Sequence, residues 1–201
     1  MTSHFLIIRH GETEFNATRV IQTPDVPLSD VGKAQACRLA EHLEGLSPTL
    51  ILTSDYQRAL DTTSQIVKLT GVAVMKSPLL RERNFGDWRG TPYAELDFDP
   101  FDPDRIPPGG ESWADFDVRV ESAFDYICNV AGSLEGRLVV VTHGLVCKAL
   151  TNNHFNSGKN IIDEPWANTS VTEVMGPPWE FLRINCTDHL AESPSDKGGI
   201  A

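Results

Sequence analysis

The sequence is short of cysteine, of basic residues and of long apolar runs, and each shortage excludes a class of protein. Four cysteines are present without a C-x-x-C pair, which argues against a disulfide framework and against a zinc site. The 17 basic residues are outnumbered by 28 acidic ones, which leaves a net charge of −11 at pH 7. Because nucleic-acid binding needs a basic surface, we expect no nucleic-acid partner.

The longest apolar runs, residues 5–8 and 138–141, have the length of a strand. A membrane-spanning helix needs about 20 apolar residues, so we expect no membrane partner. Arg9 and His10 interrupt the first run at once, and the N-terminus therefore lacks a secretory pattern. These features predict a soluble, cytoplasmic protein. Nothing in the sequence indicates an oligomeric state.

The order of the predicted elements indicates an α/β fold. Strands are predicted at 4–8, 50–53, 72–75, 138–141, 170–175 and 180–184, and helices at about 30–46, 54–69, 113–131 and 144–150. Ser29 and Ser112 are the expected N-caps of the first and third helices. Ser54-Asp55 can cap the second helix, and Gly71 is its expected stop. Strands alternating with helices predict a three-layer α/β/α fold with a mostly parallel central sheet.

Residues 83–111 interrupt this alternation with a series of prolines, glycines and acidic residues. Long irregular segments of this kind usually carry function. We predict one domain over 1–190, in which 83–111 and 152–167 are variable loops that cover the substrate. The small, polar tail at 191–201 is expected to be disordered.

Two predicted strands end in a histidine followed by a glycine, at His10-Gly11 and at His143-Gly144. In open parallel sheets, ligands bind beyond the carboxyl ends of the strands, so both histidines are expected at one site. Each glycine allows the backbone to approach a ligand closely. A neutral imidazole can attack phosphorus and form a covalent intermediate, which makes phosphoryl transfer the chemistry to consider.

Phosphoryl transfer also needs cations and an acid. An acidic chain can bind phosphate only where cations converge, and Arg9 and Arg58 are placed to do so. The planar guanidinium group meets phosphate oxygens with two hydrogen bonds. A carboxylic acid must protonate the leaving oxygen. This chemistry requires no cofactor, and the sequence shows no cluster of metal ligands, so we expect neither.

Taken in order, several motifs resemble the signature of the histidine phosphatase superfamily, the phosphoglycerate-mutase-like proteins. They are Arg9-His10-Gly11-Glu12-Thr13, Ser54-Asp55-Tyr56-Gln57-Arg58-Ala59, Leu80-Arg81-Glu82 with Phe85-Gly86-Asp87-Trp88-Arg89-Gly90, Thr142-His143-Gly144, and Asn168-Thr169-Ser170-Val171. The resemblance covers nearly the whole chain. It implies a phosphoglycerate-mutase-like fold and places the chain in the small-molecule phosphatase branch.

The resemblance also implies a role for individual residues. The implied catalytic residues are His10, Glu82, Arg9, Arg58 and His143. His10 is the nucleophile, and the two arginines and His143 form the phosphate pocket with it. Glu82 is the proton donor to the leaving group and later the base that activates water. Asp87 is the nearest alternative for the acid, and a solvated ion pair with Arg81 or Arg83 is the alternative for Glu82.

The implied substrate-binding residues are Asn16, Gln22, Thr23 and Gly144. The segment 22–28 is one residue shorter than is common in the family and lacks its glycine, so a contact between Thr23 and phosphate stays open. Whether His154 and the aromatic residues of 88–113 line the pocket is open as well.

The sequence favours a phosphatase acting on small phosphate monoesters over two alternatives. The first alternative is a phosphoglycerate mutase, whose substrate is doubly charged, but the segment 88–112 is acidic and has only Arg89 and Arg105 as cations. The second is a non-catalytic phosphate-binding or scaffold protein, but both the nucleophile and the acid are present. The physiological substrate is not indicated.

Overall fold

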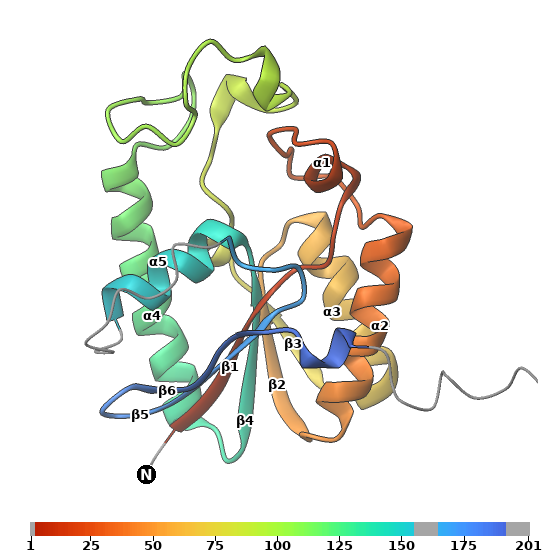
Figure 1. The fold of residues 1–201 in the computed structure, drawn as a ribbon. Helices are drawn as coiled ribbons and strands as arrows, with labels where there is room; N and C mark the ends of the chain where they lie inside the picture. The colour runs from red at the N-terminus through yellow and green to blue at the C-terminus, as the bar shows by residue number, and fades with distance from the viewer. Residues whose placement is uncertain (1–2, 155–164, 192–201) are drawn as a thin grey trace, which may run out of the picture.

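A computed structural model of the protein describes residues 3–154 and 165–191, whose strands form one six-stranded sheet (Figure 1). The strand order is β3-β2-β4-β1-β5-β6. The parallel strands are β1 (Ser3–Arg9), β2 (Pro48–Thr53), β3 (Ala73–Lys76) and β4 (Arg137–Thr142). The last two, β5 (Val171–Gly176) and β6 (Glu180–Cys186), are added as antiparallel neighbours beyond β1. The mostly parallel sheet predicted from the sequence is confirmed.

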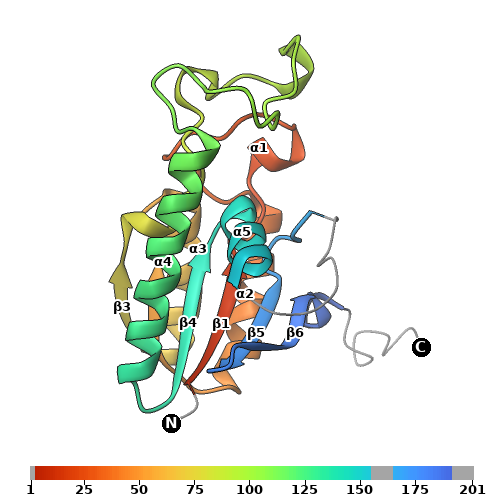
Figure 2. The same ribbon diagram turned by 90° about the vertical axis from the view of Figure 1, so that its left-hand side faces the viewer.

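Helices cover both faces of the sheet, as Figures 1 and 2 show. One face packs against α2 (Asp30–Glu44) and α3 (Gln57–Thr70). The other face packs against α4 (Trp113–Ser133) and α5 (Gly144–His154). The three-layer α/β/α arrangement is therefore confirmed.

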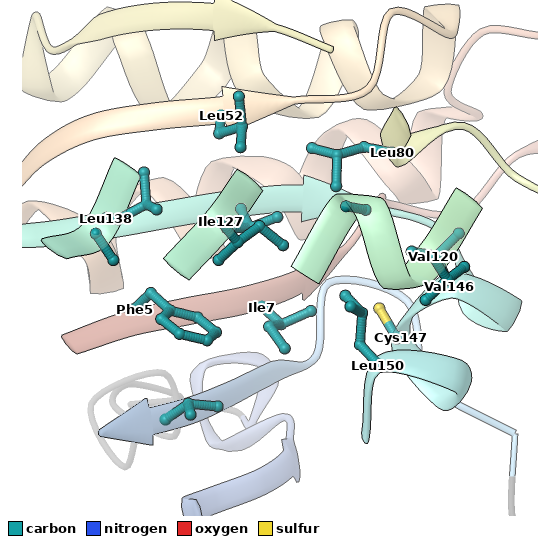
Figure 3. Packing of buried hydrophobic residues seen from close by; sticks show 14 of the residues in the cluster. Phe5, Ile7, Leu52, Leu80, Val120, Ile127, Leu138, Val146, Cys147 and Leu150 are labelled. Carbon is teal, nitrogen blue, oxygen red and sulfur yellow. The ribbon is translucent and has the colours of Figure 1, made fainter. Parts of the chain in front are cut away.

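Alternation along β1 explains why both layers form. Phe5 and Ile7 pack with Ile127 of α4 and its neighbours, and Figure 3 shows this cluster. Leu6 and Ile8 point to the opposite face and pack with α2 and α3. All four β1 side chains are almost fully buried, and burial of one such side chain contributes about 1.5–3 kcal/mol.

The helix ends follow the local signals with one exception. The hydroxyls of Ser29 and Ser112 each accept a backbone N–H three residues on, at 3.0 Å, and Gly71 ends α3 with a φ of 64°. The start of α3 differs from the prediction, because its N-cap is Tyr56 and no side chain caps it. Ser54, the expected cap, follows β2; its hydroxyl accepts from the N–H of Tyr56 at 3.3 Å and also lies 2.8 Å from Nε2 of His143.

Short elements that the sequence did not predict stand at the carboxyl end of the sheet or near the chain's end. They are α1 (Glu14–Ala17) and the 3-10 turns η1 (Pro78–Leu80), η2 (Gly86–Trp88), η3 (Tyr93–Glu95) and η4 (Asp188–Leu190). The segment 83–111 is irregular apart from η2 and η3, as expected, and Figure 1 shows it with α1 above the sheet. Of the predicted variable loop 152–167 and tail 191–201, residues 155–164 and 192–201 lie outside the described residues. Within the described part, no helix combines the length and the apolarity that a bilayer crossing requires.

Candidate active site

The two histidines meet because they follow neighbouring parallel strands. Arg9 at the end of β1 is in register with Thr142 at the end of β4, so the next residues lie side by side. The ring centroids of His10 and His143 are 5.2 Å apart, and both side chains are buried. The sequence prediction that the two strand ends form one site agrees with this geometry.

Hydrogen bonds determine the tautomer of His10. Its Nδ1 lies 2.7 Å from the carbonyl oxygen of Gly11, and Nε of Arg58 lies 3.1 Å from its Nε2. A carbonyl only accepts and a guanidinium only donates, so Nδ1 carries the hydrogen and Nε2 offers its lone pair. Burial, together with the charges of Arg58 and Arg9, holds the pKa of His10 well below its ordinary value. The imidazole is therefore neutral at pH 7, the form that can act as a nucleophile.

Two arginines act on this imidazole: the buried Arg58 contacts its lone pair, and the charge of the partly buried Arg9 lies nearby. Arg58 also donates from Nη1 to the carbonyl oxygen of Thr23 at 2.9 Å, and burial lowers its pKa to about 10, so it remains a cation at pH 7. Arg9 donates to the carbonyl oxygen of Trp166, while its buried Nε has no hydrogen-bond partner among the described residues. Unpartnered buried donors are costly and mark a place where an anion can bind.

His143 has one partnered and one free ring nitrogen. Its Nε2 lies 2.8 Å from the hydroxyl of Ser54, and its buried Nδ1 has no partner in the described part of the chain. Burial lowers the pKa of His143 well below its ordinary value, and Arg58 and His10 add to the effect. His143 is thus a second neutral imidazole with a hydrogen-bonding atom available to a ligand.

Glu82 is a carboxyl group held between two backbone amides. Its Oε1 accepts from the N–H of Arg83 at 3.1 Å and its Oε2 from the N–H of Leu145 at 3.2 Å. Burial raises the pKa of Glu82, and the amides and the charges of Arg58 and Arg9 offset part of this rise. A carboxyl group with a raised pKa is suited to donate a proton near neutral pH.

The alternatives for Glu82 fit the structure poorly. Asp87 is exposed and does not line the cavity described below. Arg81 forms its ion pair with Asp55, at 2.5 Å. The buried guanidinium of Arg83 donates to backbone carbonyls, which leaves neither arginine in a solvated pair with Glu82.

Arg9, Arg58 and Glu82 border a cavity of about 460 Å³. It is lined by Arg9, Phe15, Asn16, Arg19, Val20, Ile21, Gln22, Arg58, Glu82, Phe85, Tyr93, Phe101, Gly144, Leu145, Lys148, Pro165 and Trp166. His10 and His143 are absent from this lining because both residues are almost fully buried, and the Arg58 N–H contacts Nε2 of His10.

The predicted binding residues divide into two groups. Asn16, Gln22 and Gly144 line the cavity. The side-chain oxygens of Asn16 and Gln22 both accept from Thr13, which leaves their amide NH2 groups without a partner among the described residues. Thr23 does not line the cavity: its hydroxyl donates to Asp25 at 2.5 Å, and its carbonyl oxygen positions Arg58.

Some of the aromatic residues of 88–113 line the cavity, and others, like His154, do not. Tyr93 lines the cavity, whereas Trp88 and Phe98 pack against each other away from it. Trp113 lines an adjoining hollow of about 340 Å³. His154 contacts neither space, because its ring stacks on Phe124 of α4 with a centroid distance of 4.1 Å.

Other lining residues escaped the sequence analysis. Arg19, Lys148 and Trp166 belong to no motif that was assigned a role, and Ser54 was assigned only as a helix cap. The one signal that could have pointed to Lys148 was its position, because it stands one helical turn after Gly144 and therefore on the same face of the helix.

Three comparisons relate the chain to known proteins. A model of the histidine phosphatase superfamily (branch 1) matches residues 5–187. The glucosyl-3-phosphoglycerate phosphatase of Mycobacterium tuberculosis (strain CDC 1551 / Oshkosh) is 37% identical over 123 residues, 57% of this chain and 55% of that protein. Phosphoglycerate mutase-like protein 4 of Arabidopsis thaliana is 33% identical over 208 residues, 95% of this chain and 88% of that protein. The native structure of a mycobacterial glucosyl-3-phosphoglycerate phosphatase aligns with a TM-score of 0.76 at 27% identity, covering 92% of this chain and 100% of that one.

The match to the Mycobacterium tuberculosis protein spans little more than half of that protein's length.

Within residues 3–154 and 165–191, no group of three or more His, Cys, Asp or Glu side chains is arranged to hold a metal ion.

Proposed function

The chain belongs to the histidine phosphatase superfamily, as its motifs predicted, and we propose that it hydrolyses phosphate monoesters of small molecules through a phosphohistidine on His10. The observation that carries the proposal is the neutral imidazole of His10, whose Nε2 lone pair lies beside Arg58 with Arg9 and Glu82 bordering the same cavity. Nucleophile, cations and acid are the parts that metal-free phosphoryl transfer needs.

In the first step, the phosphate oxygens take the N–H groups of Arg58 and Arg9, which frees Nε2 of His10. The Nε2 lone pair then forms a bond to phosphorus as the bond from phosphorus to the ester oxygen breaks. Glu82 gives its proton to that leaving oxygen. The imidazole becomes positively charged, and the Gly11 carbonyl that accepts from Nδ1 stabilises this charge.

In the second step, the Glu82 carboxylate takes a proton from water. The water oxygen bonds to phosphorus and the phosphorus–nitrogen bond breaks, which releases inorganic phosphate and returns His10 to its neutral form. Glu82 is protonated again, so each turnover restores both residues.

The named relatives support a small phosphorylated substrate, and one of them carries the name of a mutase-like protein. We keep hydrolysis as the proposal because the segment 88–112 supplies no cation to the cavity: Arg89 and Arg105 lie outside its lining, and the further cations Arg19 and Lys148 come from other elements. Arg89 donates to the hydroxyl of Tyr56, and Arg105 lies over the ring of Phe98.

A cytoplasmic location is part of the proposal, supported by four cysteines that are all free thiols.

The test is phosphate release from a panel of monoesters without added metal, comparing wild type, His10→Ala and His42→Ala. His42 lies on α2 away from the cavity and serves as the matched control. We expect His10→Ala to lose turnover completely while circular dichroism stays native, and His42→Ala to remain active. Wild type incubated with a 32P-labelled donor should yield acid-labile phosphoprotein, and His10→Ala should not. Substantial turnover by His10→Ala would refute the mechanism.

A further inference from the structure

Ser54 is a fully buried serine whose hydroxyl lies between a backbone amide and the ring of His143. The hydroxyl oxygen accepts the N–H of Tyr56 at 3.3 Å and lies 2.8 Å from Nε2 of His143. The sheet fixes its position, because the Ser54 N–H donates to the Val141 carbonyl at 2.9 Å and so ties the end of β2 to β4. A hydroxyl has one hydrogen to donate, and the atom that takes this hydrogen decides how the ring of His143 is protonated.

The hydroxyl hydrogen of Ser54 has a single acceptor among the described residues. The Tyr56 amide is itself a donor, which leaves Nε2 of His143 as the other hydrogen-bond partner that these residues give the hydroxyl. If Nε2 carried a hydrogen, two N–H groups would meet the same oxygen, and the hydroxyl hydrogen would be buried without a partner at a considerable cost. Ser54 therefore donates, and Nε2 of His143 accepts.

The second ring nitrogen of His143 then carries the hydrogen. Burial lowers the pKa of His143 well below its ordinary value, so the ring holds a single hydrogen at pH 7. With Nε2 as the acceptor, that hydrogen is on Nδ1. The Nδ1–H is buried and has no partner in the part of the chain that the structure describes. A buried donor of this kind is costly unless a ligand oxygen takes its hydrogen bond.

This free N–H stands beside the nucleophile. The ring centroids of His143 and His10 are 5.2 Å apart. Arg58, whose Nε contacts Nε2 of His10, is also the charge with the largest effect on His143, which indicates that His143 lies toward the attacking atom. The ring of Tyr56 packs against His143 with a centroid distance of 5.4 Å and limits its rotation. Phosphate oxygens accept hydrogen bonds, so an N–H at this place attracts them and a lone pair would repel them.

We propose that Ser54 is a positioning residue that fixes the tautomer of His143, so that a neutral imidazole presents its Nδ1–H to an oxygen of the reacting phosphate. Ser54 lies outside the cavity lining and acts through His143. The proposal rests on the proposed function for the presence of that phosphate, whereas the tautomer is a property of the free protein. His143 then stabilises the transferred group by a hydrogen bond and neither takes up nor releases a proton.

The tautomer can be measured directly by 15N NMR of the imidazole nitrogens at pH 7, because a nitrogen with a hydrogen and one with a lone pair resonate in separate ranges. The chain has six histidines, and the His143 signals are those absent from His143→Ala. We expect hydrogen on Nδ1 of His143 in wild type, and a measurable share of molecules with hydrogen on Nε2 in Ser54→Ala. Hydrogen on Nε2 in wild type, or an unchanged tautomer in Ser54→Ala, would overturn the proposal.

Binding of inorganic phosphate, followed by calorimetry, shows whether the tautomer matters to the site. Because a hydrogen bond to a charged group is strong, Ser54→Ala should weaken phosphate binding about tenfold. In a His143→Ala background the same substitution should have almost no further effect, since Ser54 acts through His143. A merely structural role would weaken binding equally in both backgrounds, and that result would contradict the proposal.

Ser77→Ala is the matched control. Ser77 is a buried serine that follows β3 as Ser54 follows β2, and its hydroxyl also accepts the backbone N–H two residues on, from Leu79, at 3.3 Å. Its replacement should change neither the tautomer of His143 nor the affinity for phosphate, and an equal loss of affinity in this variant would count against Ser54. The result is separable from the proposed function: if wild type hydrolysed no ester but tautomer and phosphate affinity depended on Ser54, only the phosphatase assignment would fail.

Discussion

Replacement of Glu82 by glutamine removes the proton that the leaving oxygen needs and keeps the shape of the side chain. General acids contribute roughly 10²–10⁴-fold to rate, so we expect kcat/KM for an alkyl phosphate to fall at least about 100-fold, equivalent to about 2.7 kcal/mol. p-Nitrophenyl phosphate releases a stable anion without a proton, so its kcat/KM, which does not include the later step in which Glu82 activates water, should fall only about threefold or less. The assay compares both esters for wild type and Glu82→Gln, with Asp87→Asn as an exposed control.

The structure also predicts the cost in stability. Glu82 accepts one backbone N–H on each oxygen, from Arg83 and from Leu145. A glutamine keeps one acceptor and faces the other N–H with its own NH2 group, so one hydrogen bond is lost at about 1–3 kcal/mol. Loss of activity without unfolding is therefore expected, and denaturant titration would verify it.

The pH profile provides an independent check. Because burial raises the pKa of Glu82 and only the protonated acid can donate, kcat/KM for the alkyl ester should fall as pH rises through that pKa. In Glu82→Gln this decline should disappear. An equal loss of activity toward both esters would refute the acid role of Glu82, and the same leaving-group dependence in Asp87→Asn would move that role to Asp87.

Two further predictions concern the buried polar groups. The free energy of unfolding should decrease as pH falls below about 6.5, by roughly 1.4 kcal/mol per pH unit for each imidazole, because the lowered pKa values of His10 and His143 keep both neutral when folded whereas the unfolded chain protonates them. Urea titrations between pH 7 and pH 5 measure this, and a stability that does not vary with pH would contradict it. Arg83→Met should lower stability by about 3 kcal/mol and increase proteolysis within 97–111, since Arg83 donates to the carbonyls of Pro100, Arg105 and Glu111. Arg38→Met, at an exposed arginine, is the control, and equal protease resistance of the two variants would show that Arg83 does not hold the segment.

Much of the fold was readable because its signals are local. The apolar run of β1 and the caps Ser29 and Ser112 each act within a few residues, and all appear as predicted. The start of α3 was predicted too early: the Ser54 hydroxyl does accept from the Tyr56 N–H, but the Gln57 N–H donates to the distant Pro24 carbonyl and the helix begins at Gln57. A cap is a local preference, and a distant partner overrode it here.

The site also has features that the sequence determined and features that only the tertiary structure decided. By itself, the sequence determined that His10 and His143 would adjoin, because two parallel strands that end in the same direction bring their next residues together. It also supplied Arg9, Arg58 and Glu82 through their motifs. The tertiary structure alone decided which atoms of His10 carry the hydrogen and the lone pair, since that depends on Gly11 and Arg58 reaching opposite sides of one ring. It alone brought Arg19 and Lys148 into the lining of one cavity, because nothing in the spacing of two residues from different elements indicates that folding will place them at the same space.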